Sequence, residues 1–393
     1  MKRFGILVLF FLSLVLFAGC QITEGKVVFV EVIALDGDVL LSEEITFEDD
    51  GISLLDLIDE AIDLDYQMSE YGAFISGIGG FYPREHGITW NYWFSLYVDD
   101  EMSMTGLDQV ELRDGIKISF IESTMLDEVD LWVDDMIIAF IDAHLEDYLN
   151  ETSFEINVGL AYHHLSQFNS TYAPMNELLS TPFRPSAETL SGIYQNIILD
   201  RIYSENLDTH KALIEAENAD NVYSAITQLI GLMMTSSTSN KIDSLVSTLT
   251  STTPEYMDAD YAGMLLQALS FEALENQTGV ATKIEDMLTY IASNITDEGM
   301  VAYGNANASS TAQVILGLVS QGLNPRGEAY TIEGVDLIEA LKTFQIDEAF
   351  KYTLANNDAD LAFSTPQAFA ALVMYKIYRD SFSNPAVSLY HLE

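Results

Sequence analysis

Residues 305–322 read NANASSTAQVILGLVSQG, a loop rich in Asn and Ser that runs directly into an apolar stretch rich in Ala, Leu and Gln. The same pattern recurs as NADNVYSAITQLIGL at 218–232, DADYAGMLLQALS at 258–270 and NDADLAFSTPQAFAALVMY at 357–375. The copies start roughly 40 to 50 residues apart, which leaves room for two helices in each repeat. Repeated helical hairpins of this length predict an all-α region that forms either an open solenoid or a closed α/α toroid.

The region before these repeats has a different period. From Lys26 to about Ser123 the pattern is mostly an alternation of apolar and polar residues, which is typical of strands. A β-branched run at 26–35, a turn signal at Asp36-Gly37-Asp38 and renewed alternation at 39–47 predict a hairpin.

A helix is expected to follow this hairpin, because apolar residues from Leu54 to Ile62 recur at helical spacing behind the capping candidates Asp49, Asp50 and Ser53. Further strands are predicted at 73–78, 90–98, 109–112 and 116–121. Two strands, a helix and then more strands predict a small α+β fold of the β-grasp kind.

Three strings in this region carry a family resemblance. YGAFISGIGGFY at 71–82, WNYWFSLYVDDE at 90–101 and LRDGIKISFIE at 112–122 resemble the transcobalamin-like C-terminal domain found in many bacterial surface proteins. In that family an Asn-Gly turn usually follows the aromatic strand, and here Asp99-Asp100 stands in its place.

The helical repeats resemble a second group. STAQVILGLVSQGLNPRG at 310–327 and STPQAFAALVMYK at 364–376 are similar to strings in the α/α toroids of prenyltransferase subunits, triterpene cyclases and cobalamin carriers. The resemblance favours a closed toroid. We therefore expect a transcobalamin-like β-grasp domain at 26–123 and an α/α toroid at 126–393, which begins with a linker helix near 126–149.

The N-terminus has the layout of a lipoprotein signal peptide at 1–20. Lys2 and Arg3 precede an apolar run of about 12 residues, too short to span a bilayer. The pair Ala18-Gly19 before Cys20, the only cysteine, resembles a bacterial lipobox, so we expect Cys20 to be acylated and to anchor the chain to the extracytoplasmic face of the cell membrane. The alternative is an ordinary secretory signal with an incidental cysteine.

Composition excludes several classes of function. The formal charge of −45, from 61 acidic and 16 basic residues, repels phosphate backbones, so we expect no nucleic-acid partner. Solubility is the simpler explanation of this charge, and binding of divalent cations is the alternative. With Cys20 committed to lipid, no cysteine is left for a disulfide, a zinc site or a catalytic nucleophile. That rules out the zinc chemistry of the protein prenyltransferases.

Acidic pairs precede two of the repeated helices. Asp258-Ala259-Asp260 and Asp358-Ala359-Asp360 are each one carboxylate short of the D-x-D-D acid motif of the cyclases. Asp at such a position caps the helix N-terminus at a benefit of about 1 kcal/mol, and capping is the role we expect. Neither stretch has the offsets of a calcium loop, and we expect no structural metal.

The histidines show no metal-binding spacing such as H-E-x-x-H. Cobalamin carriers can supply an axial histidine to cobalt, and the resemblance makes His163, His164 and His210 the candidates here, with His391 at the end of the chain. Packing of one histidine and solvation of the other explains the pair at 163–164 equally well.

Aromatic residues supply the other ligand candidates. By alternation, Asn91, Trp93, Ser95 and Tyr97 share one face of the strand at 90–98, while the opposite face enters the core. That face combines flat apolar area with hydrogen-bonding groups, which suits a large amphipathic ligand or packing against the helical domain.

Phe81 and Tyr82, which follow Gly77, Gly79 and Gly80 in the sequence, are further candidate ligand contacts. These glycines lack the lysine and the helix of a phosphate loop and predict a turn.

These observations predict a binding protein and not an enzyme. The resemblance implies cobalamin or a related corrinoid as the ligand, captured between the two domains and passed to a membrane transporter, although the domain order is inverted relative to the carriers. Two alternatives stay open. One is a polysaccharide-active enzyme with carboxylates lining the mouth of the toroid, and the other is a surface adhesion or scaffold protein with its aromatics buried.

Overall fold

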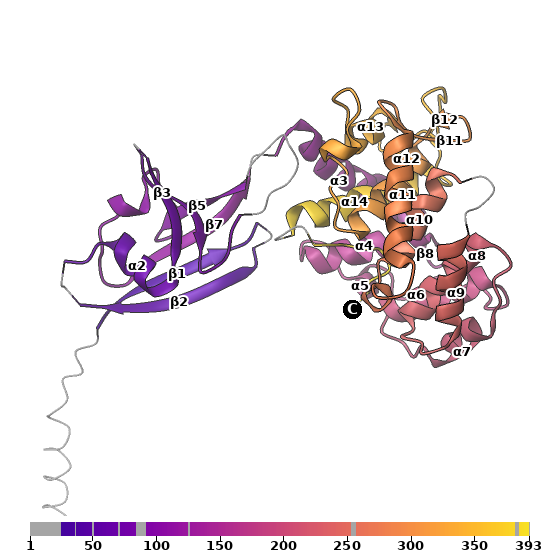
Figure 1. Ribbon diagram of the computed structural model, residues 1–393, viewed down its shortest axis with the longest axis horizontal. Helices are drawn as coiled ribbons and strands as arrows, with labels where there is room; N and C mark the ends of the chain where they lie inside the picture. The colour runs from indigo at the N-terminus through magenta and orange to yellow at the C-terminus, as the bar shows by residue number, and fades with distance from the viewer. Residues whose placement is uncertain are drawn as a thin grey trace, which may run out of the picture. The chain divides into compact units, whose positions relative to one another are not determined.

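The computed structural model describes residues 25–35, 37–48, 51–69, 71–83, 92–124, 126–252, 257–381 and 385–392. The signal segment with Cys20 lies outside these residues, as do Asp36, the capping candidates Asp49 and Asp50, and Asn91. The chain divides into a sheet unit, residues 1–83 and 93–123, and a helical unit, residues 84–92 and 124–393 (Figure 1).

The sheet unit is built on a five-stranded sheet with the order β2-β1-β7-β5-β6. Its strands are β1 (Lys26–Ile33), β2 (Val39–Phe47), β5 (Tyr92–Val98), β6 (Glu101–Met102) and β7 (Ile116–Thr124). β1 pairs with β2 in antiparallel fashion, which confirms the predicted hairpin, and with β7 in parallel fashion. A separate hairpin is formed by β3 (Leu64–Ser69) and β4 (Gly72–Ile78).

The core of this unit lies between the sheet and α2 (Leu54–Ile62). Val28, Val30 and Val32 of β1 are fully buried, as expected for every second residue of a strand with one core face. The apolar side of α2 packs against them, and the Ser53 side chain accepts a hydrogen bond from the Asp56 amide, which confirms the predicted cap.

The turn after β5 explains how Asp99-Asp100 can stand in place of the Asn-Gly pair that the resemblance led us to expect. Asp99 and Asp100 have φ values of 49° and 67°, a conformation that short polar residues tolerate better than most. Gly79 and Gly80 also have positive φ and form the predicted turn.

One strand prediction in this unit was wrong, and one strand was missed. The segment expected as a strand at 109–112 instead follows a short 3₁₀ helix, η1 (Leu107–Gln109), because Asp108 accepts a hydrogen bond of 2.6 Å from the Ala73 amide and holds this segment against β4. β3 was not predicted, since five of its six residues are exposed and show no alternation.

The helical unit follows. Its helices are α3 (Glu128–Tyr148), α4 (Ile156–Phe168), α5 (Met175–Leu178), α6 (Leu190–Ile202), α7 (Asp208–Ala216), α8 (Val222–Met234), α9 (Lys241–Ser251), α10 (Ala259–Leu269), η2 (Glu272–Leu274), α11 (Val280–Asn294), α12 (Ala308–Ser320), η3 (Glu328–Tyr330), α13 (Leu337–Thr343) and α14 (Ser364–Asp380). Short strands precede three of them: β8 (Leu149–Asn150), β9 (Ser153–Phe154), β10 (Ile295–Thr296), β11 (Gly299–Ala302), β12 (Asn305–Ala306), β13 (Gln345–Ile346) and β14 (Ala349–Phe350).

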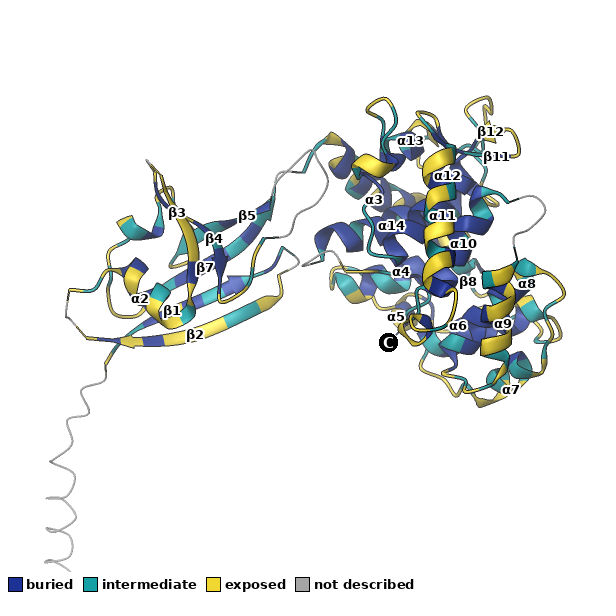
Figure 2. Ribbon diagram, in the orientation of Figure 1, coloured by how far each residue is buried: buried dark blue, intermediate teal, exposed yellow. Residues whose placement is uncertain are grey.

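The ring helices, which we define as α4, α6, α8, α10, α12 and α14, form the centre of this unit. Each packs against the next in this order, and α14 packs back against α4. α10 and α12 are almost entirely buried, whereas α9 and α11, which pack against ring helices from outside, expose one side (Figure 2). The predicted fold class, an α+β sheet domain followed by an all-α region of helical hairpins, is confirmed.

The recurring sequence phrase corresponds to ring helices. α8, α10 and α12 are preceded by the N-cap residues Asn221, Asp258 and Asn307, whose side chains accept hydrogen bonds from amides of the first turn. Asp360 accepts hydrogen bonds from the amides of Phe363 and Ser364 at the start of α14. Capping is therefore confirmed for one aspartate of each acidic pair.

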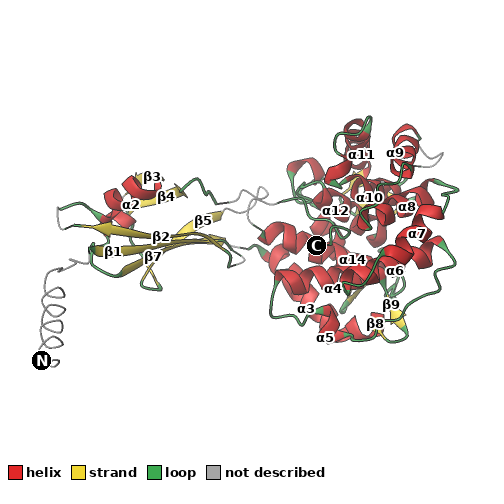
Figure 3. Cartoon of the chain, turned by 90° about the horizontal axis from the view of Figure 1, so that it is seen from below, coloured by secondary structure: helices red, strands yellow, loops and turns green. Residues whose placement is uncertain are grey.

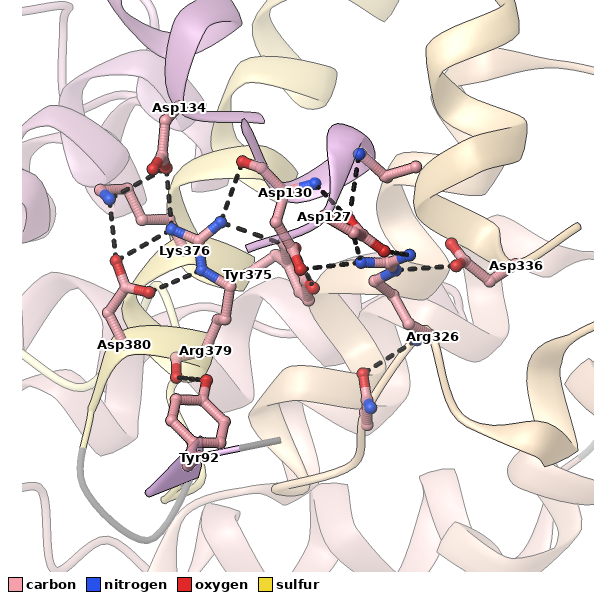
Figure 4. A network of polar contacts seen from close by, with 12 residues as sticks. Tyr92, Asp127, Asp130, Asp134, Arg326, Asp336, Tyr375, Lys376, Arg379 and Asp380 are labelled. Atoms are coloured by element: carbon pink, nitrogen blue, oxygen red, sulfur yellow. Dashed lines mark hydrogen bonds and ion pairs between the residues drawn. The ribbon is translucent and has the colours of Figure 1, made fainter. Parts of the chain in front are cut away.

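A buried ionic network joins α3, α14 and the segment after α12 (Figure 4). The Arg326 guanidinium donates to Asp130 at 2.8 Å and to Asp336 at 2.8 Å. Arg379, which is fully buried, donates to Asp134 at 2.8 Å and to the Asp130 carbonyl at 3.0 Å. Each buried charge thus has a partner, as burial in an apolar interior requires.

The C-terminal segment covers one end of the ring. The His164 Nε2 lies 3.0 Å from the Leu389 carbonyl, and the Val387 amide donates to the Val319 carbonyl at 2.9 Å. His164 and Val319 lie in the C-terminal halves of their helices, so the segment packs where ring helices finish; Figure 3 shows the helices of this unit in red. The ring helices begin at the opposite end.

No helix in the described part of the chain is long and apolar enough to cross a membrane.

Candidate functional site

The aromatic strand β5 alternates as its sequence predicts. Tyr92 and Phe94 are buried, while Trp93, Ser95 and Tyr97 on the other face are only partly buried. The Trp93 indole Nε1–H donates a hydrogen bond of 3.0 Å to the Ser95 hydroxyl. This bond fixes the indole ring along the strand, so that its apolar face stays available for a contact.

A groove of about 360 Å³ lies beside this strand, and we call it the Trp93 groove. β4 pairs with β3, and β5 pairs with β7 and β6, so the groove lies where two separately paired strands face each other. Trp93 contributes one wall, Phe74 of β4 another, and Met102 and Met104 line the groove behind the turn after β5.

The lining of the groove is apolar and largely open to solvent. Tyr71 is 72% exposed, Met104 86%, Met102 55% and Phe74 53%. Single exposed apolar residues are common, but a contiguous group of them around a hollow marks a surface that binds something. Methionine adds a flexible, polarisable contact that adapts to the shape of a ligand.

Close backbone packing forms the floor of the groove. A side chain at Gly106 would place its Cβ 2.3 Å from the Ala73 nitrogen and 2.6 Å from the Gly72 carbonyl carbon. The Gly106 amide donates to the Tyr71 carbonyl at 2.9 Å. Only glycine permits this approach, which holds the segment of Met102 and Met104 against β4.

The structure brings together only part of the predicted ligand set. Trp93 lines the groove, and Tyr97 lies opposite Met102 in the β5–β6 pairing without lining it. Tyr82 lies elsewhere, with its ring against Gly77 and its hydroxyl donating to Asp65. Phe81 makes an isolated β-bridge with Ile78, and Asn91 lies outside the described residues.

The candidate histidines belong to the helical unit. Burial, aided by the neighbouring His164, lowers the pKa of His163 to about 4, which keeps the imidazole neutral. Burial also lowers the pKa of His164, whose Nε2 is occupied by the Leu389 carbonyl. His210 is paired through Nδ1 with Asp200. A neutral imidazole is the form that binds a metal, so of these His163 has the freest ring in that form.

The described residues contain no cluster of three or more His, Cys, Asp or Glu side chains arranged to hold a metal ion.

Sequence reasoning missed Tyr71, Phe74, Met102 and Met104. Phe74 was assigned only to the strand at 73–78, Tyr71 only to the string at 71–82 that carries the resemblance, and the methionines follow the aromatic strand in a polar stretch. The available signal was Met102 and Met104, two methionines within three residues in a polar stretch. Methionine in such a stretch indicates an adaptable contact surface, because its side chain is flexible and polarisable.

Comparison with known proteins places the groove in a shared domain. Residues 51–121 match the model of a domain of unknown function, DUF4430, and this span contains all of the groove residues named above. A crystal structure from Ruminococcus gnavus, described as "a putative metal binding protein", is similar to 26% of this chain and 99% of that chain, with 21% sequence identity and a TM-score of 0.22. No curated protein matches the chain.

Proposed function

We propose that the chain is a lipid-anchored, extracytoplasmic binding protein that is not an enzyme, with cobalamin or a related corrinoid as its favoured ligand. The observation that carries the proposal is the Trp93 groove, an exposed apolar hollow with a fixed indole wall. Such a hollow with a few hydroxyl groups nearby is the usual form of a small-molecule site.

The chemistry of the groove suits one side of a corrinoid. Trp93 and Phe74 offer flat apolar surfaces, and Ser95 and Ser103 add hydroxyl groups that could bond to the amides at the rim of the macrocycle. A volume of about 360 Å³ is near the lower end for ligand sites. The groove would therefore hold one edge of the ligand and leave the rest of it free for further contacts.

The first experiment is calorimetric titration of the chain from Gln21 onward with cyanocobalamin, together with its visible spectrum. One-to-one binding is expected, and Trp93→Ala should weaken it by about tenfold, since one aromatic contact contributes up to about 1.5 kcal/mol beyond its area. The control is Trp132→Ala, which removes a tryptophan of α3 whose indole donates to Gln345.

The outcomes separate the candidate functions. Loss of affinity in Trp93→Ala but not in Trp132→Ala supports the groove as the site. If cyanocobalamin fails to bind at micromolar concentration, the corrinoid proposal is wrong. A change in stability alone after Trp93→Ala would instead favour the scaffold alternative.

The anchor has its own test. Acylation of Cys20 with two chains would hold the protein stably at the membrane, where it could pass its ligand to a transporter. Cys20→Ser should move the protein from the membrane fraction to the soluble fraction and abolish labelling by a fatty-acid analogue. Membrane retention without the cysteine would contradict the lipid anchor.

A further inference from the structure

The open end of the ring contains a second pocket, of about 650 Å³, which we call the mouth pocket. Its walls come from the starts of α10, α12 and α14 and from the loop before α14. The lining residues used below are Asp260, Tyr352, Asn356, Asp358, Phe363 and Gln367. The ring thus has a pocket where its helices begin, while the C-terminal segment covers the end where they finish.

Buried polar atoms around this pocket have no partner. The Asp260 Oδ1 and the Gln367 Oε1 are both shielded from solvent, and neither makes a hydrogen bond within the described residues. The Ser310 hydroxyl, which is 1% exposed, lies beside the Asp260 carboxyl and acts on it as a hydrogen-bond donor, but outside good hydrogen-bonding geometry, so Asp260 is only partly satisfied. Buried polar groups are almost always paired, so an unpaired group at the wall of a cavity indicates a partner that binds there.

Asp260 differs from the aspartate that caps the same helix. Asp258 accepts the hydrogen bond from the Tyr261 amide, which leaves Asp260 without a capping role. Burial raises the pKa of Asp260, and the Asp258 charge adds to this rise while the Ser310 hydroxyl opposes it. A carboxyl that gains a proton readily can both donate and accept a hydrogen bond.

Aromatic surface lies next to these polar groups. Phe363 lines the pocket and is 67% exposed, and Tyr352 lines it from the preceding loop. Tyr303, 74% exposed, donates a hydrogen bond of 3.1 Å to Asp258 at the start of α10. Flat exposed rings beside carboxyl and amide groups offer both a stacking surface and hydrogen-bond acceptors.

We propose that the mouth pocket binds a neutral saccharide. The sugar ring would stack on Phe363, and its hydroxyl groups would donate to Asp358, Asn356 and the unpaired oxygens of Asp260 and Gln367. An anionic ligand would be repelled, because none of the residues that line the pocket is basic. An apolar ligand would leave the buried oxygens unpaired, at a cost of about 1 to 3 kcal/mol each.

The test is calorimetric titration of the full chain, in a detergent without sugar groups, with maltohexaose, cellohexaose, xylohexaose, mannohexaose and chitohexaose. At least one should bind. Phe363→Ala should then weaken binding by about tenfold, since stacking on one ring is lost. Gln367→Leu, of similar shape, should weaken it several-fold without lowering the melting temperature, because the oxygen removed has no partner in the protein.

The matched control is Phe74→Ala, which removes another exposed phenylalanine, 53% against 67% for Phe363, from the Trp93 groove and should leave saccharide affinity unchanged. Spermidine serves as the cationic probe. Failure of all five oligosaccharides at millimolar concentration overturns the proposal, and so does saccharide binding that both pocket variants leave intact. Spermidine binding that Phe363→Ala abolishes, without saccharide binding, would assign the pocket to amines. None of these outcomes depends on whether the Trp93 groove binds a corrinoid.

Discussion

The two units of the chain place their positive charges differently. In the sheet unit, Arg113 pairs with Asp99 on the surface, where their side chains are 53% and 40% exposed. In the helical unit, Arg326 and Arg379 are buried, and Asp130 between them is fully buried as well. With only 16 basic residues against 61 acidic ones, each arginine placed in the interior is one fewer to neutralise the surface.

This difference shows what holds each unit together. The sheet unit depends on strand alternation and the apolar side of α2, and its described surface ion pairs are worth little because water and salt screen them. The helical unit has an apolar core too, but its α3–α14 contact contains charges that are costly to bury unless every partner is present. Loss of a single cation should therefore affect the two units very unequally.

The largest effect is expected for Arg379→Met. The substitution takes from the Asp134 and Asp380 carboxylates the buried guanidinium that bonds to both and leaves them only Lys376, which also bonds to both. Removal of one partner from a buried ion-pair network costs about 3 to 5 kcal/mol. Urea unfolding should show the helical unit destabilised by this amount, with the transition of the sheet unit unchanged.

The matched control is Arg113→Met in the sheet unit. Because this arginine is exposed, the free energy of unfolding should fall by less than about 1 kcal/mol. Equal losses in the two variants would contradict the contrast between buried and exposed pairs.

Acid should also act mainly on the helical unit. The pKa of His163 is lowered from 6.5 to about 4 by burial, so between these values the unfolded chain binds a proton that the folded chain does not. Stability is then lost as the pH falls through this range, by up to about 3 kcal/mol for this residue, and the loss is complete below pH 4. Unfolding measured from pH 7 to pH 4 should show a shallower decline in His163→Gln.

The sheet unit supplies the internal reference for this titration. Its described residues include no histidine, so its transition should not carry the same decline. Because burial also lowers the pKa of His164 and His391, His163→Gln should remove part of the slope and not all of it. An unchanged slope would show that His163 is more accessible to protons than its burial implies.

The Trp93 groove should be sensitive to Gly106→Ala. The added Cβ would lie 2.3 Å from the Ala73 nitrogen, so the two backbones must separate, and overpacking of this kind costs about 1 to 3 kcal/mol. Unfolding of the sheet unit would report the loss, and titration with cyanocobalamin would report damage to the groove. Gly25→Ala is the control, because its Cβ would meet only Thr46, at 3.9 Å. A neutral Gly106→Ala would show that the floor of the groove can adapt.

Sequence patterns predicted the elements far better than the sites. The periodicity of apolar residues and the capping residues correctly located β1, β2, α2 and the repeated ring helices, because both signals depend on residues that are close in the sequence. The packing of α14 against α4 could not be predicted from these signals, because α4 lacks the repeated loop sequence and its cap is Glu155. The Trp93 groove combines four separate segments, and only the fold brings Phe74 and Met104 beside Trp93.

The acidic pairs show how a correct local prediction can hide a site. Asp258 and Asp260 were both assigned to capping, but a helix N-terminus has a single N-cap position, which Asp258 takes. At the second pair Asp360 binds the amides, while Asp358 lines the mouth pocket. The extra aspartate in each pair was therefore the available signal that capping did not explain both residues.

The smallest effect is expected for Asp100→Gly, which tests whether surface charge contributes to the stability of the sheet unit. Asp100 has a φ of 67° and forms an ion pair with Lys117, but its side chain is 77% exposed. Asp100→Gly relieves the positive φ and loses only a screened pair, so the free energy of unfolding should rise by less than about 1 kcal/mol. Urea denaturation of the variant beside the parent would measure this change. If the variant is instead destabilised by more than about 1 kcal/mol, the surface pairs of the sheet unit contribute more than their exposure implies, and the contrast with the buried network of the helical unit becomes one of degree.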